Sequence, residues 1–250
     1  KIINKNISDL DKLKYFDLVI LCLGGQSVIY DKLLKERSIN KDYHEIAVTG
    51  YVKHNLKKIN TSQFFLKEGP LAILPFSKNC FSFVWSLKKE FHKRNLKSLN
   101  KLVRGKILEV IKSNINLNIS NIQSYPISLG LKRQYHEKNV LILGEGLHVI
   151  HPVAGQGFNL VLRDIKKLKE IIKYYSELGI SIKNSNALND FYNSRKPENM
   201  IIGLGVDATH NFFKKNKYLD PLKEIIVKNL SNSSTLKKIS KIISNQGLSF

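Results

Sequence analysis

The residues best suited to hold a ligand lie in the run VLILGEGLHVIHPVAGQGFNLVLRDI, residues 140–165. An apolar, strand-like segment ends there at Gly144, and a loop that contains Pro152 leads to Gly155-Gln156-Gly157, where a long helix is expected to begin. The first turn of a helix carries unpaired N–H groups and partial positive charge, and glycines let a ligand come against the backbone itself. This helix start can therefore hold a phosphate or a planar heterocycle that becomes negative during a reaction.

An acid in the same run narrows the choice of ligand. Glu145 directly follows the strand, where its carboxylate can accept hydrogen bonds from sugar or ribityl hydroxyls and would repel a naked phosphate. A hydroxyl-binding acid next to an N–H-rich helix start favours a cofactor that has both a polyol and a heterocycle, such as a flavin. Gly144 and Gly146 also match half of a dinucleotide fingerprint, but the third glycine is missing and Pro152 follows.

Two histidines of the run, His148 and His151, are spaced like metal ligands on a helix. Pro152 argues against a helix at this point, and no third ligand of a suitable type lies near them in the sequence. We therefore predict no metal site, and we expect both histidines to pack or to orient the loop.

Several other segments must position this run. A β-branched-rich segment at residues 15–27 is typical of a buried strand in a parallel sheet, and two-residue alternation between residues 45 and 131 predicts a mostly antiparallel sheet. A basic surface helix is expected within residues 86–111. Apolar residues from Phe158 to Tyr175 recur every three or four positions and predict a long helix, and the lysine-rich remainder is expected to be helical.

One predicted strand carries Phe81, Phe83 and Trp85 on a single face. These rings either cover the core of the sheet or form the wall of an apolar substrate pocket. We take Phe83 and Trp85 as candidate substrate-binding residues.

The composition argues against some classes of function. The formal net charge is +21, but only six of the 41 basic residues are arginine and the lysines are scattered, so nucleic-acid binding is not predicted. The longest apolar run, residues 16–25, has about half of the roughly 20 residues that a membrane span requires, which indicates a soluble or peripheral protein. Cys22 and Cys80 are expected to be reduced core thiols. Because residue 1 is lysine and no signal peptide is recognised, the chain is expected to begin inside a longer one.

The run from Gly144 to Leu160, continuing to Arg163 and Asp164, closely resembles the signature GDAAHxIHPLAGQGLNLGLRD of FAD-dependent aromatic hydroxylases, in particular the ubiquinone-biosynthesis hydroxylases. The segment QFFLKEGPLAILPFSKNCFSFVWSL is similar to the middle sheet of that branch, and YPISLGLKRQYHEKNVLILGEG is similar to its return strand. The resemblance covers nearly the whole chain.

The resemblance implies an α/β (α+β) fold with Rossmann-like FAD-binding parts, a mostly antiparallel substrate sheet and C-terminal helices. We expect the end of the first FAD-binding part at residues 1–35, the substrate-binding sheet at 36–133, the second FAD-binding part at 134–180 and a helical region at 181–250. The residues that the resemblance implies in FAD binding are Gly144, Glu145, Pro152, Gly155, Gln156, Gly157, Phe158 and Asn159.

The implied reaction is hydroxylation of the aromatic ring of a polyprenylated phenol in ubiquinone biosynthesis. NAD(P)H reduces FAD, dioxygen adds at the flavin C4a atom, and the resulting C4a-hydroperoxyflavin delivers one oxygen atom, so the cofactor carries the chemistry. We expect no side chain of this chain to act as a general acid or base.

Because the implied substrate is strongly apolar, we expect a cytoplasmic protein held peripherally at the inner face of a bacterial or mitochondrial-type membrane. We also expect it to take part in a ubiquinone-biosynthesis complex. A basic C-terminal helix with one apolar side either contacts that membrane or, as we favour, packs on the domain. Its apolar residues are Leu236, Ile239, Ile242 and Ile243.

The chain departs from the family at several positions. The family usually has Asp at the position of Glu145, Asp at that of Leu23 and Arg at that of Tyr30. Since the segment around Leu23 normally helps to hold FAD, these changes motivate an alternative, a non-catalytic relative that binds a quinone-precursor lipid or acts as a scaffold. A third option is a hydroxylase or oxidase of the same superfamily that acts on a soluble aromatic.

The Gly-x-Gly-x-x-Gly unit that takes the ADP half of FAD does not occur in these residues, so we expect the chain alone to bind FAD poorly.

Overall fold

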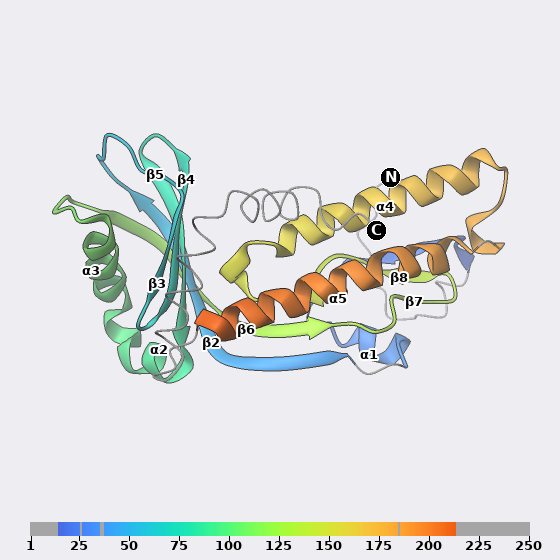
Figure 1. Ribbon diagram of the computed structural model, residues 1–250, viewed down its shortest axis with the longest axis horizontal. Coiled ribbons are helices and arrows are strands. Elements are labelled where there is room, and N and C mark those ends of the chain that lie inside the picture. Colours follow the sequence, from blue (N-terminus) through green and yellow to red (C-terminus); the bar gives the residue numbers. More distant parts are fainter. Residues whose placement is uncertain (1–14, 26, 36–37, 185, 214–250) are drawn as a thin grey trace.

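The computed structural model describes residues 15–25, 27–35, 38–184 and 186–213. Figure 1 shows a curved sheet with short helices at one end of the molecule, and long helices that run from this sheet along a smaller sheet. This mixed architecture confirms the predicted α/β (α+β) fold class.

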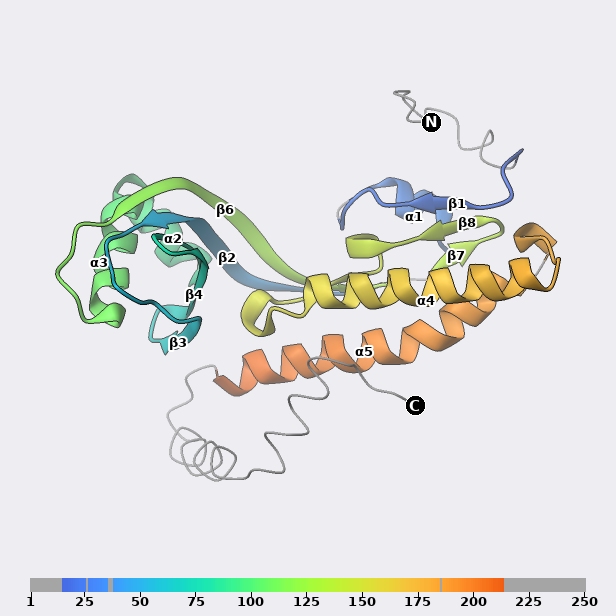
Figure 2. The ribbon, with the colours of Figure 1, turned by 90° about the horizontal axis from the view of Figure 1, so that it is seen from above.

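The larger sheet has six strands in the order β3-β4-β5-β2-β6-β9, and its neighbours pair in antiparallel fashion, which confirms the expected antiparallel sheet. The long strands β2 and β6 pair with each other and extend toward the smaller sheet (Figure 2). The strands are β2 (Ile39–Lys53), β3 (Ser62–Leu66), β4 (Gly69–Ser77), β5 (Cys80–Lys88), β6 (Asn118–Leu131) and β9 (His148–Val149).

Helices cover one face of this sheet. α2 (Lys89–Asn95) and α3 (Leu99–Ile111), with a 3₁₀ turn (Leu96–Ser98) between them, form where the basic helix was expected. Their apolar sides are buried against the sheet, and removing this surface from water stabilises this end of the molecule. The buried residues include Val48, Leu71, Phe81, Phe83, Trp85, Leu99, Val103 and Ile107.

Phe83 and Trp85 therefore have core positions instead of the expected substrate contact. Neither side chain is accessible to solvent, because α3 covers their face of β5. The opposite face of the strand, which carries Val84, lines a small hollow together with Pro152 and Val153. The alternation in β5 predicts its two faces correctly, but the face directed at Pro152 and Val153 is the one without aromatic rings.

The smaller sheet joins segments that are far apart in the sequence. Its strands β1 (Val19–Leu21), β8 (Val140–Ile142) and β7 (His136–Glu137) lie in the order β1-β8-β7. β1 and β8 are parallel, which confirms the parallel strand expected within residues 15–27. Cys22 is exposed, contrary to the expected core position, because it lies just beyond the end of β1; Cys80 is partly buried, and both are free thiols.

Two long helices complete the described fold. α1 (Ile29–Leu33) is short, whereas α4 (Gly157–Glu177) and α5 (Ala187–Phe213) lie side by side (Figures 1 and 2). The start of α4 at Gly157 confirms the helix predicted there. Among the described residues, no helix combines the length and the apolar character that crossing a bilayer requires. The stripe at residues 236–243 lies outside the described residues.

Candidate functional site

The carboxyl ends of the two parallel strands carry the first loops of the candidate site. After β1 the chain passes through residues 23–25, and soon after β8 it forms a 3₁₀ turn (Gly144–Gly146). The loops are in contact, since a Cβ added at Gly25 would lie 2.4 Å from Val149 Cγ2 and 3.2 Å from the Glu145 carbonyl oxygen. Open α/β sheets bind ligands in this position, beyond the carboxyl ends of their strands.

Tyr30 anchors the loop that follows β1. Its ring is fully buried, and its hydroxyl accepts a hydrogen bond from the Leu23 N–H at 2.8 Å. Burial raises the pKa of the Tyr30 hydroxyl, so the phenol stays neutral at physiological pH. The two residues that differ from the family at this loop are therefore partners, with Leu23 exposed and Tyr30 holding its backbone from the core.

The loop that leads into α4 offers unused backbone donors. His151 Nδ1 accepts a hydrogen bond from the Val153 N–H at 3.0 Å, so this histidine orients the loop as expected. Gly155 has φ +60°, and a Cβ added there would meet no atom within 4 Å. Among the described residues, no side chain caps the start of α4, and the Gln156 side chain accepts a hydrogen bond from Asn159 Nδ2 at 3.3 Å.

The two groups of predicted FAD-binding residues lie close together. The turn Gly144–Gly146 contacts α4, and the Glu145 side chain is exposed beside it. An exposed carboxylate, open space at Gly155 and a helix start without a side-chain cap thus occur at one corner of the molecule.

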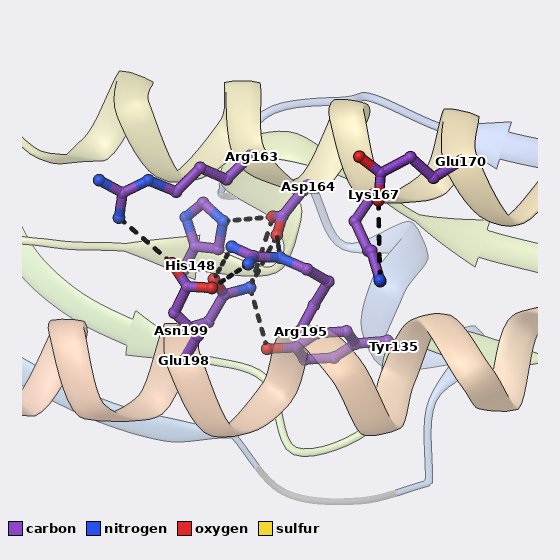
Figure 3. Close-up of polar contacts among 9 residues, drawn as sticks. All are labelled: Tyr135, His148, Arg163, Asp164, Lys167, Glu170, Arg195, Glu198 and Asn199. Atoms are coloured by element: carbon purple, nitrogen blue, oxygen red, sulfur yellow. Dashed lines mark hydrogen bonds and ion pairs between the residues drawn. The ribbon is translucent and has the colours of Figure 1, made fainter. Parts of the chain in front are cut away.

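A buried network holds α4, α5 and β9 together behind this corner (Figure 3). Asp164 of α4 accepts hydrogen bonds from His148 Nε2 and Arg195 Nε, both at 2.7 Å, and from Asn199 Nδ2 at 3.1 Å. Arg195 also pairs with Glu198 one turn further along α5. The side chains of His148 and Asp164 are inaccessible to solvent, so these two residues of the motif serve the scaffold.

A second polar cluster lies where the larger sheet meets α5. Glu45 of β2 accepts hydrogen bonds from His151 Nε2 at 3.1 Å and from His210 Nε2 at 3.0 Å. The two imidazole rings stack with their centroids 4.1 Å apart, and the Tyr43 ring meets both of them edge-on. The Tyr43 hydroxyl donates to Asp207 Oδ1 at 2.7 Å. We call Tyr43, Glu45, His151 and His210 the Glu45 cluster.

A bulge in β2 directs Glu45 into this cluster. The register with β6 passes from Asp42 opposite Ser128 directly to Glu45 opposite Ile127, so two extra residues lie between them on β2. His44, one of the two, adopts φ +55°, and its N–H donates to Asp42 Oδ1 at 2.8 Å. Bulges re-aim side chains and are frequent next to active sites.

The hydrogen bonds fix the protonation of the cluster. Since His151 Nδ1 accepts the Val153 N–H, its Nε2 carries the hydrogen that is donated to Glu45. Burial acts to raise the pKa of the Glu45 carboxyl, but the hydrogen bonds from His151 and His210 outweigh burial and lower this pKa from 4.5 to about 2.

The same three residues are close enough to suggest a metal site. Ligand atoms of Glu45, His151 and His210 lie within 4.8 Å of one another, which corrects the expectation that His151 has no further ligand nearby. The folded chain brings these residues together although the sequence separates them. However, the protonated Nε2 of His151 has no lone pair to give to an ion, so the geometry favours a hydrogen-bonded cluster.

The lowered pKa of Glu45 predicts a pH dependence of stability. Because the folded pKa is about 2 against an ordinary 4.5, the stabilisation is present above pH 4.5 and is lost as the pH falls toward 2. We expect wild type to be more stable than Glu45→Gln near neutral pH and this advantage to shrink below pH 4.5. Urea unfolding at stepped pH measures it, with the exposed Glu177→Gln as control. An advantage that does not vary with pH would contradict the assignment.

A pocket of about 320 Å³ opens beside the Glu45 cluster. Its walls come from the cluster, from the turn between β3 and β4 (residues 65–70) and from Val153 of the loop before α4. Apolar and charged groups face one another here, and small-molecule pockets combine apolar walls with a few placed polar groups. Sequence reasoning missed this pocket, because Glu45 and His210 have no neighbours in the sequence that mark them as a site.

Comparison with known proteins identifies the family. A family model described as squalene epoxidase matches residues 92–243, more than half of the chain. The mitochondrial ubiquinone biosynthesis monooxygenase COQ6 of Dictyostelium discoideum is 27% identical over 277 residues, which is 92% of this chain and 56% of that protein. The 3-demethoxyubiquinol 3-hydroxylase of Escherichia coli is 28% identical over 166 residues, 66% of this chain and 42% of that protein. The chain therefore belongs to the squalene epoxidase family that this model describes, and the two curated relatives are named as a ubiquinone biosynthesis monooxygenase and a demethoxyubiquinol hydroxylase.

Solved structures share the fold of this chain. The FAD-dependent monooxygenase pqsL of Pseudomonas aeruginosa, described as probable, matches with a TM-score of 0.65 at 18% identity, over 85% of this chain and 59% of that one. HpxO of Klebsiella pneumoniae, solved with FAD, matches with a TM-score of 0.65 at 14% identity, over 90% of this chain and 60% of that one. Likenesses at this level of identity establish the fold alone.

The chain spans about half the length of the curated relatives that it matches. The family model and the relatives agree on oxygenase chemistry but differ in the substrate that their names carry, squalene in one case and a ubiquinone precursor in the other. Family membership therefore fixes the class of protein, and the substrate must be argued from the site.

Proposed function

We propose that this chain forms part of an FAD-dependent monooxygenase that hydroxylates the aromatic ring of a polyprenylated phenol in ubiquinone biosynthesis. The observation that carries the proposal is that one pocket borders both Val153, in the loop that would carry the flavin, and Glu45 of the sheet. A ring bound in this pocket would lie beside the cofactor loop. The names of the relatives support a ubiquinone precursor as the substrate class.

The residues at the corner between β8 and α4 fit a flavin. Backbone N–H groups at the uncapped start of α4 would stabilise negative charge on the pyrimidine side of the ring, and the Glu145 carboxylate would accept hydrogen bonds from ribityl hydroxyls. When bound and reduced by NAD(P)H, FAD supplies the activation of dioxygen and the transfer of one oxygen atom. The proposed contacts are Gly144, Glu145, Pro152, Gly155, Gln156, Gly157, Phe158 and Asn159.

The chain itself contributes position and electrostatics. The pocket would hold the substrate ring between the β3–β4 turn and the loop before α4, and its apolar residues Phe65, Leu66 and Pro70 would exclude water from one side of the ring. Because a polyprenyl tail is apolar, we further expect the protein to work at the inner face of a membrane, within a biosynthetic complex.

The test uses protein purified from its complete reading frame. Its flavin absorbance is recorded, and NADPH and NADH oxidation are then followed with and without a short-chain polyprenylphenol, under isotopically labelled dioxygen. We expect a yellow protein whose oxidation of the nicotinamide rises when the phenol is added, and a product that carries one labelled oxygen atom.

A colourless protein that leaves the phenol unchanged would contradict the proposal. If such a protein still bound the phenolic lipid, the result would favour the non-catalytic relative that the changes at Leu23 and Tyr30 motivate.

A further inference from the structure

His210 is a buried histidine that lines the pocket, and one of its ring nitrogens is unused among the described residues. Its side chain is only 4% exposed, its Nε2 is bonded to Glu45, and among the described residues its buried Nδ1 has no hydrogen-bond partner. A buried polar atom without a partner is costly and requires an explanation, of which contact with a ligand is one. We propose that the Glu45–His210 pair binds the hydroxyl of an aromatic ligand in this pocket and accepts its proton on His210 Nδ1.

The tautomers single out His210 within the Glu45 cluster. His151 uses Nδ1 to accept the Val153 N–H and Nε2 to donate to Glu45, so both of its nitrogens are engaged. His210 Nε2 faces the Glu45 carboxylate, which accepts hydrogen bonds and therefore selects the tautomer with hydrogen on Nε2. This choice leaves a lone pair on His210 Nδ1, which can act as a base.

Glu45 makes proton acceptance at His210 favourable. When the hydroxyl O–H bond breaks and the Nδ1–H bond forms, the ligand becomes a phenolate and His210 becomes an imidazolium, so charge and protons balance. The imidazolium is paired at once with the Glu45 carboxylate 3.0 Å away, in a site that water scarcely reaches. A carboxylate bonded to the far nitrogen of an imidazole orients the ring and stabilises its charged form.

Other charged groups face this pair and must be counted. The Tyr43 hydroxyl donates a separate hydrogen bond to Asp207. Burial and the neighbouring acids raise the pKa of this hydroxyl, so Tyr43 stays protonated and does not compete as the base. Lys41 pairs with the same Asp207 at 2.5 Å. The remaining charged or titratable groups that line the pocket are His44, Lys67, Glu68, Lys88 and Glu90.

The strand geometry is consistent with a functional role for this pair. The bulge with left-handed His44 lies immediately before Glu45, and without the two extra residues Glu45 would pair at a different position along β6. The sequence analysis predicted no general acid or base, because the cofactor would carry the chemistry, and neither Glu45 nor His210 belongs to the motif near residue 150.

The inference rests on the proposed function only for the identity of the substrate, so its test uses 4-nitrophenol and needs neither FAD nor turnover. The absorbance of the bound probe distinguishes phenol from phenolate. In the wild type we expect the phenolate-to-phenol ratio of the bound probe to exceed that of the free probe by about tenfold or more near pH 6. His210→Gln should return the ratio to that of the free probe, and Glu45→Gln should lower it part of the way.

Two controls separate chemistry from folding. 4-Nitroanisole, which has no hydroxyl, should bind to His210→Gln as it does to the wild type, and this shows that the pocket is intact. His54→Gln replaces another buried histidine that lines a different pocket, and it should leave the ratio unchanged.

A wild type that does not shift the ratio, or a His210→Gln variant that keeps the shift while it binds 4-nitroanisole, would overturn the inference. If the protein is an active hydroxylase and gives either of these results, the proposed function stands and only the role of His210 as proton acceptor is refuted. A colourless, inert protein that still ionises 4-nitrophenol through His210 would contradict the proposed hydroxylase function and support the role of the Glu45–His210 pair.

Discussion

Replacing Asp164 with alanine is expected to destabilise the fold by about 3–5 kcal/mol, the usual cost of removing one partner from a buried ion pair. Asp164 is inaccessible to solvent and accepts hydrogen bonds from His148, Arg195 and Asn199. Without it, Arg195 keeps Glu198 as a partner, but its Nε–H and the His148 Nε2–H lose their acceptor inside the protein. The lost hydrogen bonds lie at the junction of α4, α5 and β9, and this junction supports the loop at residues 151–157.

Urea unfolding followed by circular dichroism measures this loss. Glu177→Ala is the matched control, since Glu177 lies on the same helix but forms an exposed pair with Lys173, and such pairs contribute about 0–1 kcal/mol. Asp164→Asn, which keeps the shape and removes the charge, should lie between the two. If Asp164→Ala unfolded at the same urea concentration as Glu177→Ala, the network would not be a source of stability.

Gly155→Ala is expected to weaken FAD binding by at least about tenfold, which corresponds to about 1.4 kcal/mol. Gly155 has φ +60°, and a Cβ there would project into space that no protein atom occupies within 4 Å, at the corner where we place the flavin. The new methyl group would meet the cofactor, and alanine in a left-handed conformation costs about 1–2 kcal/mol in addition.

Gly179 provides the control for the backbone cost. It has φ +68°, a Cβ there would also meet no atom within 4 Å, and it follows the far end of α4. Gly179→Ala should therefore lose the same stability as Gly155→Ala and keep its affinity for FAD, as measured by fluorescence titration of protein from the complete reading frame. Equal FAD affinities in the two variants would contradict the placement of the flavin next to Gly155.

The motif near residue 150 divides its residues between two tasks. Gly155 and Gln156 would present backbone to the proposed flavin, whereas His148 and Asp164 are buried and join the helices to the sheet (Figure 3). His151 belongs to both groups, since one nitrogen shapes the loop and the other reaches Glu45. A signature can thus be recognised as a unit although its residues serve different tasks.

Local patterns of apolar residues predict the helices and strands whose formation depends on residues close together in the sequence. The alternation in residues 45–131 predicted the antiparallel strands, and the spacing of apolar residues after Gly157 predicted α4, because each pattern repeats with the period of its own backbone. The same patterns did not decide which apolar face is buried. In α4, Leu168 and Ile171 are buried while Phe158 and Leu162 are exposed, and in β5 the face of Phe83 lies under α3.

The sequence by itself determined the fold class, the family and the glycine-rich helix start, since these follow from short-range periodicity and from one contiguous signature. Only the tertiary structure decided that Glu45, His151 and His210 share one site. Their meeting depends on the bulge in β2 and on the packing of α5 against the sheet. Both depend on long-range contacts, which leave no regular spacing in the chain.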